Sequence, residues 1–298
     1  MVAWRRPGER LPPPPTGTSC EWAEVDVLDR AAVDAAVEVT RPDQAFHLAG
    51  AAHVGHSWDN VSQTLAVNVL GTHYLLSALA AHAPSCRVLV TGSALVYRPA
   101  DHALGEDDPL GPVSPYGLSK LGQEMTGLRA FKEAGLPVLV ARSFNHIGPR
   151  QAASFSTAGF ARQIARIEAG LAPPVLHVGN LDTRRDLTDV RDTIEAYRVL
   201  VARGLPGRIY NVCSGRAYPI ARILDGLLGL ARVPIDVRTD PSLLRRQDVP
   251  VILGDPARVA HDTGWVPRIP IEQSLADIVE YWRAVVLSET GPRGDAAT

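Results

Sequence analysis

The strongest constraint on the fold is the alternation of short apolar runs with longer stretches of helical periodicity. The apolar runs lie at 44–49, 87–91, 137–142 and 208–213. The stretches with helical periodicity lie at 30–40, 59–82, 115–133 and 189–203. Short apolar runs are typical of strands buried on both faces, and parallel strands need a crossover helix between them. The chain is therefore predicted to be α/β, with a doubly wound parallel sheet.

The composition argues against several other classes of protein. The 298 residues carry a formal net charge of -2, which disfavours a strongly basic nucleic-acid-binding protein. Cys20, Cys86 and Cys213 are too few and too scattered for a disulfide framework or a set of zinc ligands, so no metal site is expected. No apolar run is judged to reach the roughly 20 residues of a membrane span. We therefore expect a cytoplasmic protein with no nucleic-acid or membrane partner.

The chain is predicted to divide into a larger domain and a smaller lobe. Residues 1–149 are predicted to form the larger domain, to which 184–213 would return. Residues 150–183 and 214–290 are predicted to form a smaller C-terminal substrate lobe, and 291–298 a loose tail. The crevice between the two, at the carboxyl ends of the parallel strands, is the expected ligand site.

The motif Tyr116-Gly117-Leu118-Ser119-Lys120 opens a predicted helix, since Pro115 stands where helices can begin. Residues four apart share a helix face, so Tyr116 and Lys120 are expected to lie together. A free tyrosine has a pKa of about 10, which a neighbouring ammonium lowers. Such a pair can act as acid and base on a carbonyl or an alcohol. The spacing alone is common by chance, and the alternative is a surface tyrosine beside a solvated lysine.

Two flanking segments give this motif a context. Ser93 follows the apolar run 87–91, at the carboxyl end of a strand, and its hydroxyl could bind the same substrate oxygen as Tyr116. The segment 142–149 has the pattern Arg-x-Phe-Asn-x-x-Gly-Pro and follows another strand. Together these features resemble the extended short-chain dehydrogenase/reductase family, which contains nucleotide-sugar epimerases, dehydratases and reductases. The resemblance implies a Rossmann-type sheet, an NAD(P)-binding domain at 1–149, and Ser93, Tyr116 and Lys120 as catalytic residues.

The resemblance also indicates which residues bind the cofactor. They are Arg5, Arg6, Asp26, Val27, Leu48, Ala49, Gly50, Asn68, Tyr116 and Lys120. Asp26 resembles the family's acidic residue at the adenine ring, and Asn68 its structural asparagine. Arg5 and Arg6 stand where the family places the 2′-phosphate of NADP, so NADP(H) is favoured and NAD(H) is the alternative cofactor. The alternative for both arginines is a solvated surface position.

Two further segments, 178–192 and 244–250, resemble the branch of the family that acts on GDP-mannose derivatives. In that branch, arginines at such places meet the nucleotide diphosphate, which guanidinium groups can bind through paired hydrogen bonds. The residues that the resemblance places at the GDP-sugar are Ser57, Asn145, Asn180, Arg185, Arg245 and Asp248. For Arg185 and Arg245 the alternative is a salt bridge to a neighbouring carboxylate.

Ala94 and Leu95 bear on which reaction of the family to expect. The resemblance implies that 4,6-dehydratases carry a glutamate here, which removes the C5 proton of the sugar, and leucine cannot do so. We therefore expect NADPH-dependent reduction of the C4 ketone of GDP-4-dehydro-6-deoxy-D-mannose to GDP-D-rhamnose, by a homodimer. The alternatives are a nucleotide-sugar 4-epimerase and a truncated, non-catalytic remnant that binds sugar nucleotides.

The N-terminal region departs from the family. The family begins with a strand and a Gly-rich turn for the pyrophosphate, whereas only Gly8 and Gly17 precede Asp26. Residues 1–6 resemble the end of the second strand, so the first strand and helix are expected to be missing. That strand lies in the middle of the sheet, and its loss would leave buried backbone groups unpaired at about 1–3 kcal/mol each. We expect a start farther upstream, a damaged fragment, or direct closure of the second strand onto the fourth.

Overall fold

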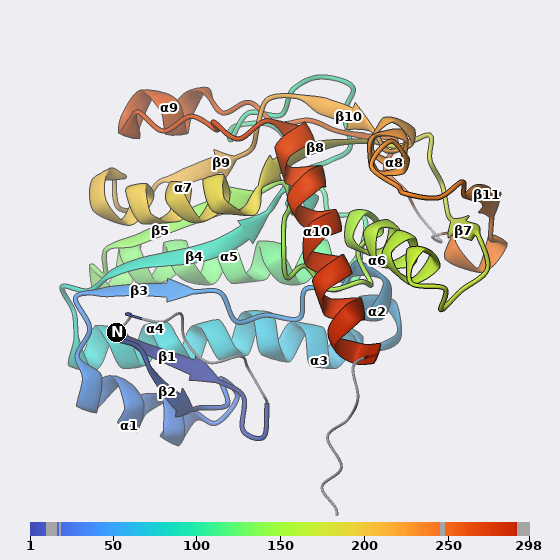
Figure 1. Cartoon of the computed structure of the whole chain (residues 1–298). Coiled ribbons are helices and arrows are strands. Elements are labelled where there is room, and N and C mark those ends of the chain that lie inside the picture. The colour runs from blue at the N-terminus through green and yellow to red at the C-terminus, as the bar shows by residue number, and fades with distance from the viewer. Residues whose placement is uncertain (10–16, 18, 245–247, 291–298) are drawn as a thin grey trace, which may run out of the picture.

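A four-stranded parallel sheet forms the centre of the larger domain. Its strands, in spatial order, are β3 (Gln44–His47), β4 (Arg87–Ser93), β5 (Val138–Ser143) and β9 (Ile209–Val212) (Figure 1). The computed structural model that contains this sheet describes residues 1–9, 17, 19–244 and 248–290. The predicted α/β fold with a doubly wound, Rossmann-type parallel sheet is confirmed.

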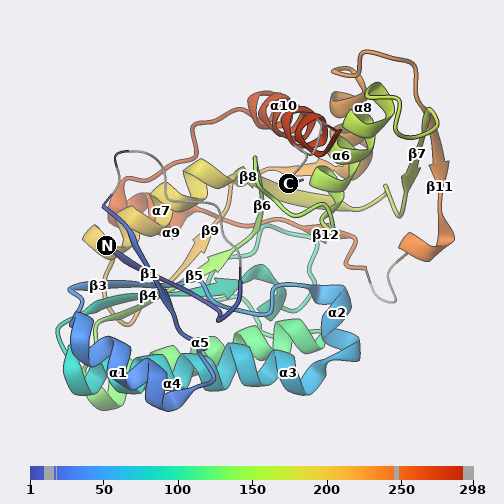
Figure 2. The ribbon, with the colours of Figure 1, turned by 60° about the horizontal axis from the view of Figure 1, so that its bottom comes forward.

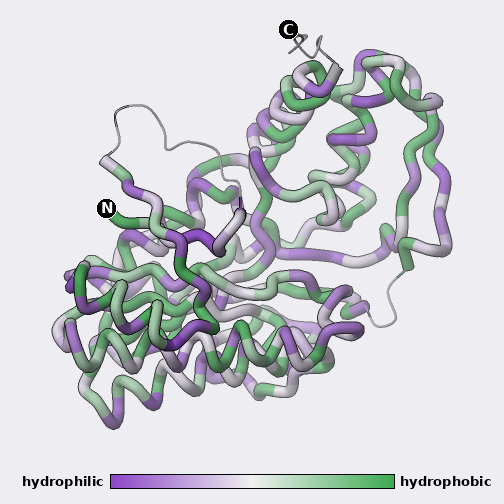
Figure 3. Tube along the Cα trace, turned by 90° about the horizontal axis from the view of Figure 1, so that it is seen from below, coloured by the Kyte–Doolittle hydropathy of each residue, from purple (hydrophilic) through white to green (hydrophobic). Residues whose placement is uncertain are grey.

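Helices cover both faces of this sheet (Figure 2). One face carries α1 (Arg30–Thr40), α4 (Gly71–His82) and α5 (Pro115–Ala134), and the other carries α7 (Val190–Arg203) and α9 (Ala257–Thr263). Because successive strand residues point to opposite faces, Val88 and Val90 pack with α1 and α4, whereas Leu89 packs with α7. Hydrophilic and hydrophobic residues alternate along the helices, as expected when one side of each helix is buried (Figure 3).

The helix predicted at 59–82 is observed at Val61–His82, in three consecutive pieces. It consists of α3 (Val61–Leu65), a π-helical turn (Ala66–Leu70) and α4. By length and composition Val61–His82 could cross a membrane, so the expectation that no segment of the chain reaches that length is wrong. In the structure Leu75, Leu76 and Leu79 of this segment are buried in the core beside α1 and β4.

The N-terminal strands form a separate two-stranded parallel sheet. β1 (Val2–Arg5) pairs with β2 (Glu21–Glu24), which confirms a strand within residues 1–6. Among the residues that the structure describes, no strand pairs with the second edge of β1 or of β3. Direct closure of β1 onto β3 is therefore not observed.

The C-terminal lobe contains small sheets packed beside three helices. β8 (Arg184–Asp189) lies between β10 (Ala217–Pro219) and β12 (Val251–Ile252) and also pairs with β6 (Asn145–Ile147). β7 (Val175–Val178) pairs with β11 (Asp236–Thr239). α6 (Ser156–Glu168), α8 (Ile220–Leu228) and α10 (Ile271–Thr290) share one hydrophobic core. Of the segment 184–213, α7 and β9 lie in the larger domain, whereas β8 lies in this lobe.

Candidate active site

Ser93 and Tyr116 meet at the carboxyl end of β4. Ser93 ends this strand and is followed by a 3-10 turn at Ala94–Val96, while Tyr116 lies in the first turn of α5. The first turn of α5 is closed by the N-cap residue Ser114, whose hydroxyl accepts a hydrogen bond from the Gly117 amide at 3.1 Å. The Ser93 hydroxyl lies close enough to the Tyr116 phenol to act on its pKa. The structure thus brings together two of the three predicted catalytic groups.

Gly117 makes this close approach of α5 to the 3-10 turn possible. A Cβ atom at position 117 would lie 2.4 Å from the carbonyl oxygen of Leu95, and 3.0 Å from Cβ of Pro112. Only a residue without a side chain fits there, because backbone cannot retreat as a flexible side chain can. The glycine therefore fixes how near Tyr116 lies to Ser93.

The surroundings of Tyr116 raise its pKa. Burial is the main cause, and the nearby Ser93 hydroxyl opposes it in part. From the sequence we expect Lys120 to lower this pKa, and that expectation is wrong, because Lys120 is not among the groups that shift the pKa of Tyr116. Tyr116 is protonated at neutral pH, as an unperturbed tyrosine also is, and so has a proton to donate, although its raised pKa makes it a weaker acid.

The Lys120 ammonium points to groups other than the Tyr116 phenol. The side chain is 5% exposed, and its Nζ donates to the Thr91 carbonyl oxygen at 2.6 Å and to Gln123 Oε1 at 2.5 Å. Burial lowers the pKa of Lys120 to about 8. Lys120 therefore lies beneath the carboxyl end of β4, as a cation that is close to losing its proton near neutral pH.

Asn68 links the turn after β3 to the catalytic helix. It lies in the π-helical turn and is fully buried, and its Oδ1 accepts from the Ala51 amide at 2.8 Å. Its Nδ2 donates to the Ser119 hydroxyl at 2.8 Å, and that hydroxyl donates to the Tyr116 carbonyl oxygen at 2.7 Å. Asn68 thus holds two walls of the site in register, which agrees with the structural role that the resemblance implies.

The other predicted cofactor residues lie at the edges of β2 and β3. Leu48, Ala49 and Gly50 follow β3 directly and are exposed, so their backbone is open to a ligand. Asp26 caps the turn after β2, since its Oδ1 accepts from the Leu28 amide at 2.9 Å. Val27 beside it packs against Gly71 of α4, where an added Cβ would lie 3.0 Å from the valine methyl.

The two arginines at the end of β1 are in different situations. Arg5 forms an ion pair with Glu24 of β2 at 3.0 Å, whereas Arg6 is exposed. Arg6 is thus the arginine that is open to a phosphate.

Ser57 does not offer its hydroxyl to a substrate. It lies in α2 (Val54–Asp59) and is 1% exposed. Its hydroxyl donates to the Val54 carbonyl oxygen at 2.7 Å and accepts from the Tyr116 amide at 3.2 Å. The predicted substrate contact is replaced by a positioning role, because Ser57 supports the first turn of α5.

Three of the predicted substrate residues meet in the lobe. Arg185 Nη2 donates to Asp248 Oδ1 at 2.6 Å, and Asn180 Nδ2 donates to Asp248 Oδ2 at 3.4 Å. The salt bridge that was the alternative for Arg185 is therefore present, and Asp248 orients the guanidinium. Asn145 is exposed on β6, and Arg245 lies outside the described residues.

A buried ion pair behind the site is not anticipated by the sequence analysis. Arg142 at the end of β5 is 1% exposed and makes paired hydrogen bonds with the Glu124 carboxylate of α5, at 2.8 and 2.6 Å. It also donates to the Glu106 carbonyl oxygen at 2.9 Å and stacks on Tyr97 at 4.6 Å. The signal for this pair is an arginine inside an otherwise apolar run. The pair fixes α5, and hence Tyr116, against β5.

Ser143 and Tyr197 form a further hydroxyl pair that the sequence analysis misses. Their oxygens lie 2.5 Å apart, and burial raises the pKa of Tyr197 to about 12.

Among the described residues, no three His, Cys, Asp or Glu side chains come together in a group that could hold a metal ion.

A parallel α/β sheet with a Ser–Tyr pair and a buried lysine at the carboxyl end of its strands defines an extended short-chain dehydrogenase/reductase. Residues 9–278 match the model of the GDP-mannose 4,6 dehydratase family, and the chain belongs to this family.

Two relatives and two solved structures illustrate the similarity. The chain is 41% identical to a GDP-6-deoxy-D-mannose reductase of Pseudomonas aeruginosa, over 83% of each chain. It is 27% identical to GDP-mannose 4,6 dehydratase 2 of Arabidopsis thaliana, over 86% of this chain and 69% of that one. The structure of RMD from P. aeruginosa complexed with NADPH matches with a TM-score of 0.83 at 36% identity, over 90% and 92% of the chains. The structure of MoeE5 in complex with UDP-glucose and NAD matches with a TM-score of 0.84 at 27% identity, over 96% of this chain and 91% of that one.

Proposed function

We propose that this chain reduces the C4 ketone of GDP-4-dehydro-6-deoxy-D-mannose with NADPH, giving GDP-D-rhamnose. The observation that carries the proposal is the Ser93–Tyr116 pair, which is followed by Ala94 and Leu95 rather than by a carboxylate. Such a site can protonate an oxygen but has no base at these positions for a C5 proton. The similarity to a GDP-6-deoxy-D-mannose reductase and to a structure complexed with NADPH supports the same choice.

The residues at the carboxyl ends of β3 and β4 fit the nicotinamide end of the cofactor. The exposed backbone at 48–50 and the Lys120 ammonium would hold this end, and Arg6 would meet the 2′-phosphate of NADP. When bound, NADPH supplies the hydride for the ketone carbon. A Gly-rich turn for the pyrophosphate is not found in the sequence before Asp26.

The protein's own residues provide the proton and the orientation. Tyr116, protonated at neutral pH, donates its proton to the C4 oxygen as negative charge develops there. Ser93 lies close to the same phenol and orients the ketone oxygen toward it. Lys120, whose pKa is about 8, holds its ammonium against the Thr91 carbonyl oxygen at the carboxyl end of β4, where it would contact the bound cofactor.

The test incubates the purified protein with GDP-4-dehydro-6-deoxy-D-mannose and NADPH, follows oxidation of the cofactor, and identifies the product by NMR of the sugar C4. We expect one GDP-D-rhamnose per NADPH oxidised. Interconversion of C4 epimers of an intact sugar nucleotide, without net cofactor oxidation, would instead indicate a 4-epimerase. Binding of the GDP-sugar without turnover, by a protein that does not bind NADPH, would indicate a non-catalytic remnant.

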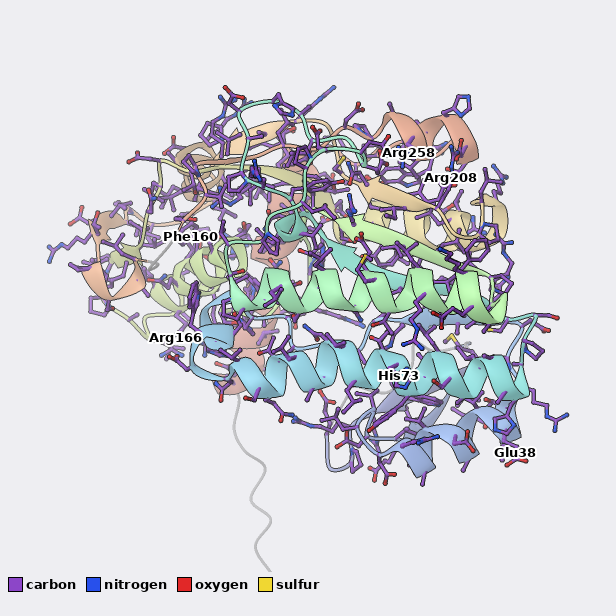
Figure 4. All side chains as sticks on the ribbon, turned by 180° about the vertical axis from the view of Figure 1, so that it is seen from behind. Glu38, His73, Phe160, Arg166, Arg208 and Arg258 are labelled. Atoms are coloured by element: carbon purple, nitrogen blue, oxygen red, sulfur yellow. The ribbon has the colours of Figure 1, made fainter. Side chains whose placement is uncertain are left out.

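We further propose a cytoplasmic homodimer that takes a GDP-sugar and has no nucleic-acid or membrane partner. The support for a dimer is the outer face of α4 and α5, which run side by side with no other element over them when the molecule is seen from behind (Figure 4). His73 lies on this face (Figure 4). Leu118 and Met125 of α5 are exposed and, being seven residues apart, lie on one face of that helix.

A further inference from the structure

A cavity away from the candidate active site lies in the C-terminal lobe. Its volume is about 500 Å³, which is within the usual range for sites that bind small molecules. The end of β8, the segment 214–222 and the loop 267–270 before α10 line it. In Figure 1 these segments meet where β8, β10 and the start of α10 come together. Neither Ser93 nor Tyr116 lines this cavity.

Three arginines from different segments line the cavity. Arg216 precedes β10, Arg222 lies in the first turn of α8, and Arg268 lies in the loop before α10. All three reach the cavity surface, and among the described residues none of them has a carboxylate within salt-bridge distance. They therefore present guanidinium groups that can bind an anion through hydrogen bonds, and Arg268 also interacts with the charge of Glu195 outside the lining.

The acidic groups of the cavity do not balance these charges. Asp189 accepts from Arg191 at 2.8 Å and from the Ser274 hydroxyl at 2.6 Å, so its charge is already compensated. Arg191 in turn pairs with Asp277 at 2.7 Å. Glu272, in the first turn of α10, is the remaining carboxylate of the lining, against three guanidinium groups.

The rest of the lining suits the organic part of a ligand. The ring of Tyr218 offers an aromatic face, with Arg222 at 5.8 Å from its centre, and Pro267 and Ile269 add apolar wall. Thr188, also in the lining, is 3% exposed, and its hydroxyl has no hydrogen-bond partner among the described residues.

We propose that this cavity is a binding site for a small organic phosphate, held by Arg216, Arg222 and Arg268. Guanidinium groups bind phosphate oxygens through paired, charge-assisted hydrogen bonds, and three of them around one cavity match a mono- or diphosphate ester. The cavity is large enough for an organic group to lie against Tyr218. The proposal does not depend on the reductase activity.

The test is calorimetric titration with pyrophosphate at constant ionic strength. The cavity variant carries Arg216→Gln, Arg222→Gln and Arg268→Gln, and the control variant carries Arg129→Gln, Arg232→Gln and Arg238→Gln, arginines that do not line the cavity. We expect the cavity variant to bind pyrophosphate at least about tenfold more weakly than the parent, and the control variant to bind as the parent does. Each series is repeated with Arg185→Gln, which removes the phosphate contact expected at the candidate active site.

Equal affinity in the parent and the cavity variant would overturn the proposal. An equal loss of pyrophosphate affinity in the control variant would also overturn it. So would a loss of affinity caused by Arg185→Gln alone, since pyrophosphate would then bind elsewhere. Circular dichroism of each variant checks that the fold is intact, as expected for substitutions of side chains that reach the surface. The cavity variant should keep the parent rate of NADPH oxidation, so this proposal and the proposed function fail or succeed separately.

Discussion

Tyr116 combines a buried phenol with the nearby Ser93 hydroxyl. Replacing it with phenylalanine keeps the ring in place and removes the proton donor. General acid catalysis is typically worth about 10²–10⁴-fold, so kcat for ketone reduction should fall by that order, while the affinity for the GDP-sugar changes little. Steady-state kinetics and sugar-nucleotide titration measure the two quantities. A Tyr116→Phe enzyme as fast as the parent would remove Tyr116 from the mechanism.

The lowered pKa of Lys120 predicts how the free energy of unfolding depends on pH. In the folded protein this pKa is about 8, against 10.5 for an unperturbed lysine, so between these pH values the unfolded chain binds the extra proton. The contribution of Lys120 to the free energy of unfolding is therefore present at high pH and is lost as the pH falls through about 8. Its full size is on the order of 3 kcal/mol.

Urea titrations of the parent and of Lys120→Met between pH 7 and pH 10 check this sign. Methionine keeps much of the side-chain volume and cannot titrate. The difference in unfolding free energy, parent minus variant, should become more favourable to the parent as the pH rises. A difference that stays constant across this range would show that Lys120 is not desolvated as the structure has it.

Some residues of the site could be predicted from the sequence, and others could not. Tyr116 and Ser93 carry recognisable local patterns, and the structure brings them together. The roles of Ser57 and Lys120 depend on which backbone groups lie opposite them, and the Tyr116 amide and the Thr91 carbonyl become their partners only through tertiary packing. Sequence spacing places a side chain on a helix face, but it does not say which acceptor that side chain will find.

At the scale of secondary structure, the contact between α5 and the turn at Ala94–Val96 positions the catalytic pair. Gly117→Ala would place a Cβ atom 2.4 Å from the Leu95 carbonyl oxygen, so the first turn of α5 must shift. We expect kcat to fall more than about tenfold and stability to fall by about 1–3 kcal/mol. Kinetics and thermal unfolding measure both.

Gly55→Ala in α2 is the matched control, since nothing lies within 4 Å of a Cβ atom at that position. Alanine is also the better helix former, so this variant should be at least as stable as the parent. If Gly117→Ala behaved like Gly55→Ala, the packing at Leu95 would not control the site.

The predictability of each element follows from its burial. β4 and β5 are buried on both faces, and their sequences are continuous apolar runs that predict strands. β8 has the sequence Arg-Arg-Asp-Leu-Thr-Asp, whose buried charged side chains are held by ion pairs and by backbone groups of other segments, so its composition does not predict a strand. The π-helical turn around Asn68 is likewise recognisable only from its hydrogen bonds.

At the scale of the whole molecule, the proposed dimer depends on the outer face of α4 and α5 (Figure 4). Met125 is 56% exposed at the middle of α5 and far from the first turn that carries Tyr116. A carboxylate at the centre of an apolar dimer interface would be desolvated without a partner, so Met125→Glu should convert dimer to monomer without unfolding the chain.

Light scattering coupled to size-exclusion chromatography measures the mass of the parent and of this variant. Leu287→Glu is the control, because Leu287 is a similarly exposed apolar residue on α10, in the other part of the molecule. We expect only Met125→Glu to halve the mass. A parent that is already monomeric would refute the dimer. A dimer that survives Met125→Glu and is lost with Leu287→Glu would place the interface away from α5.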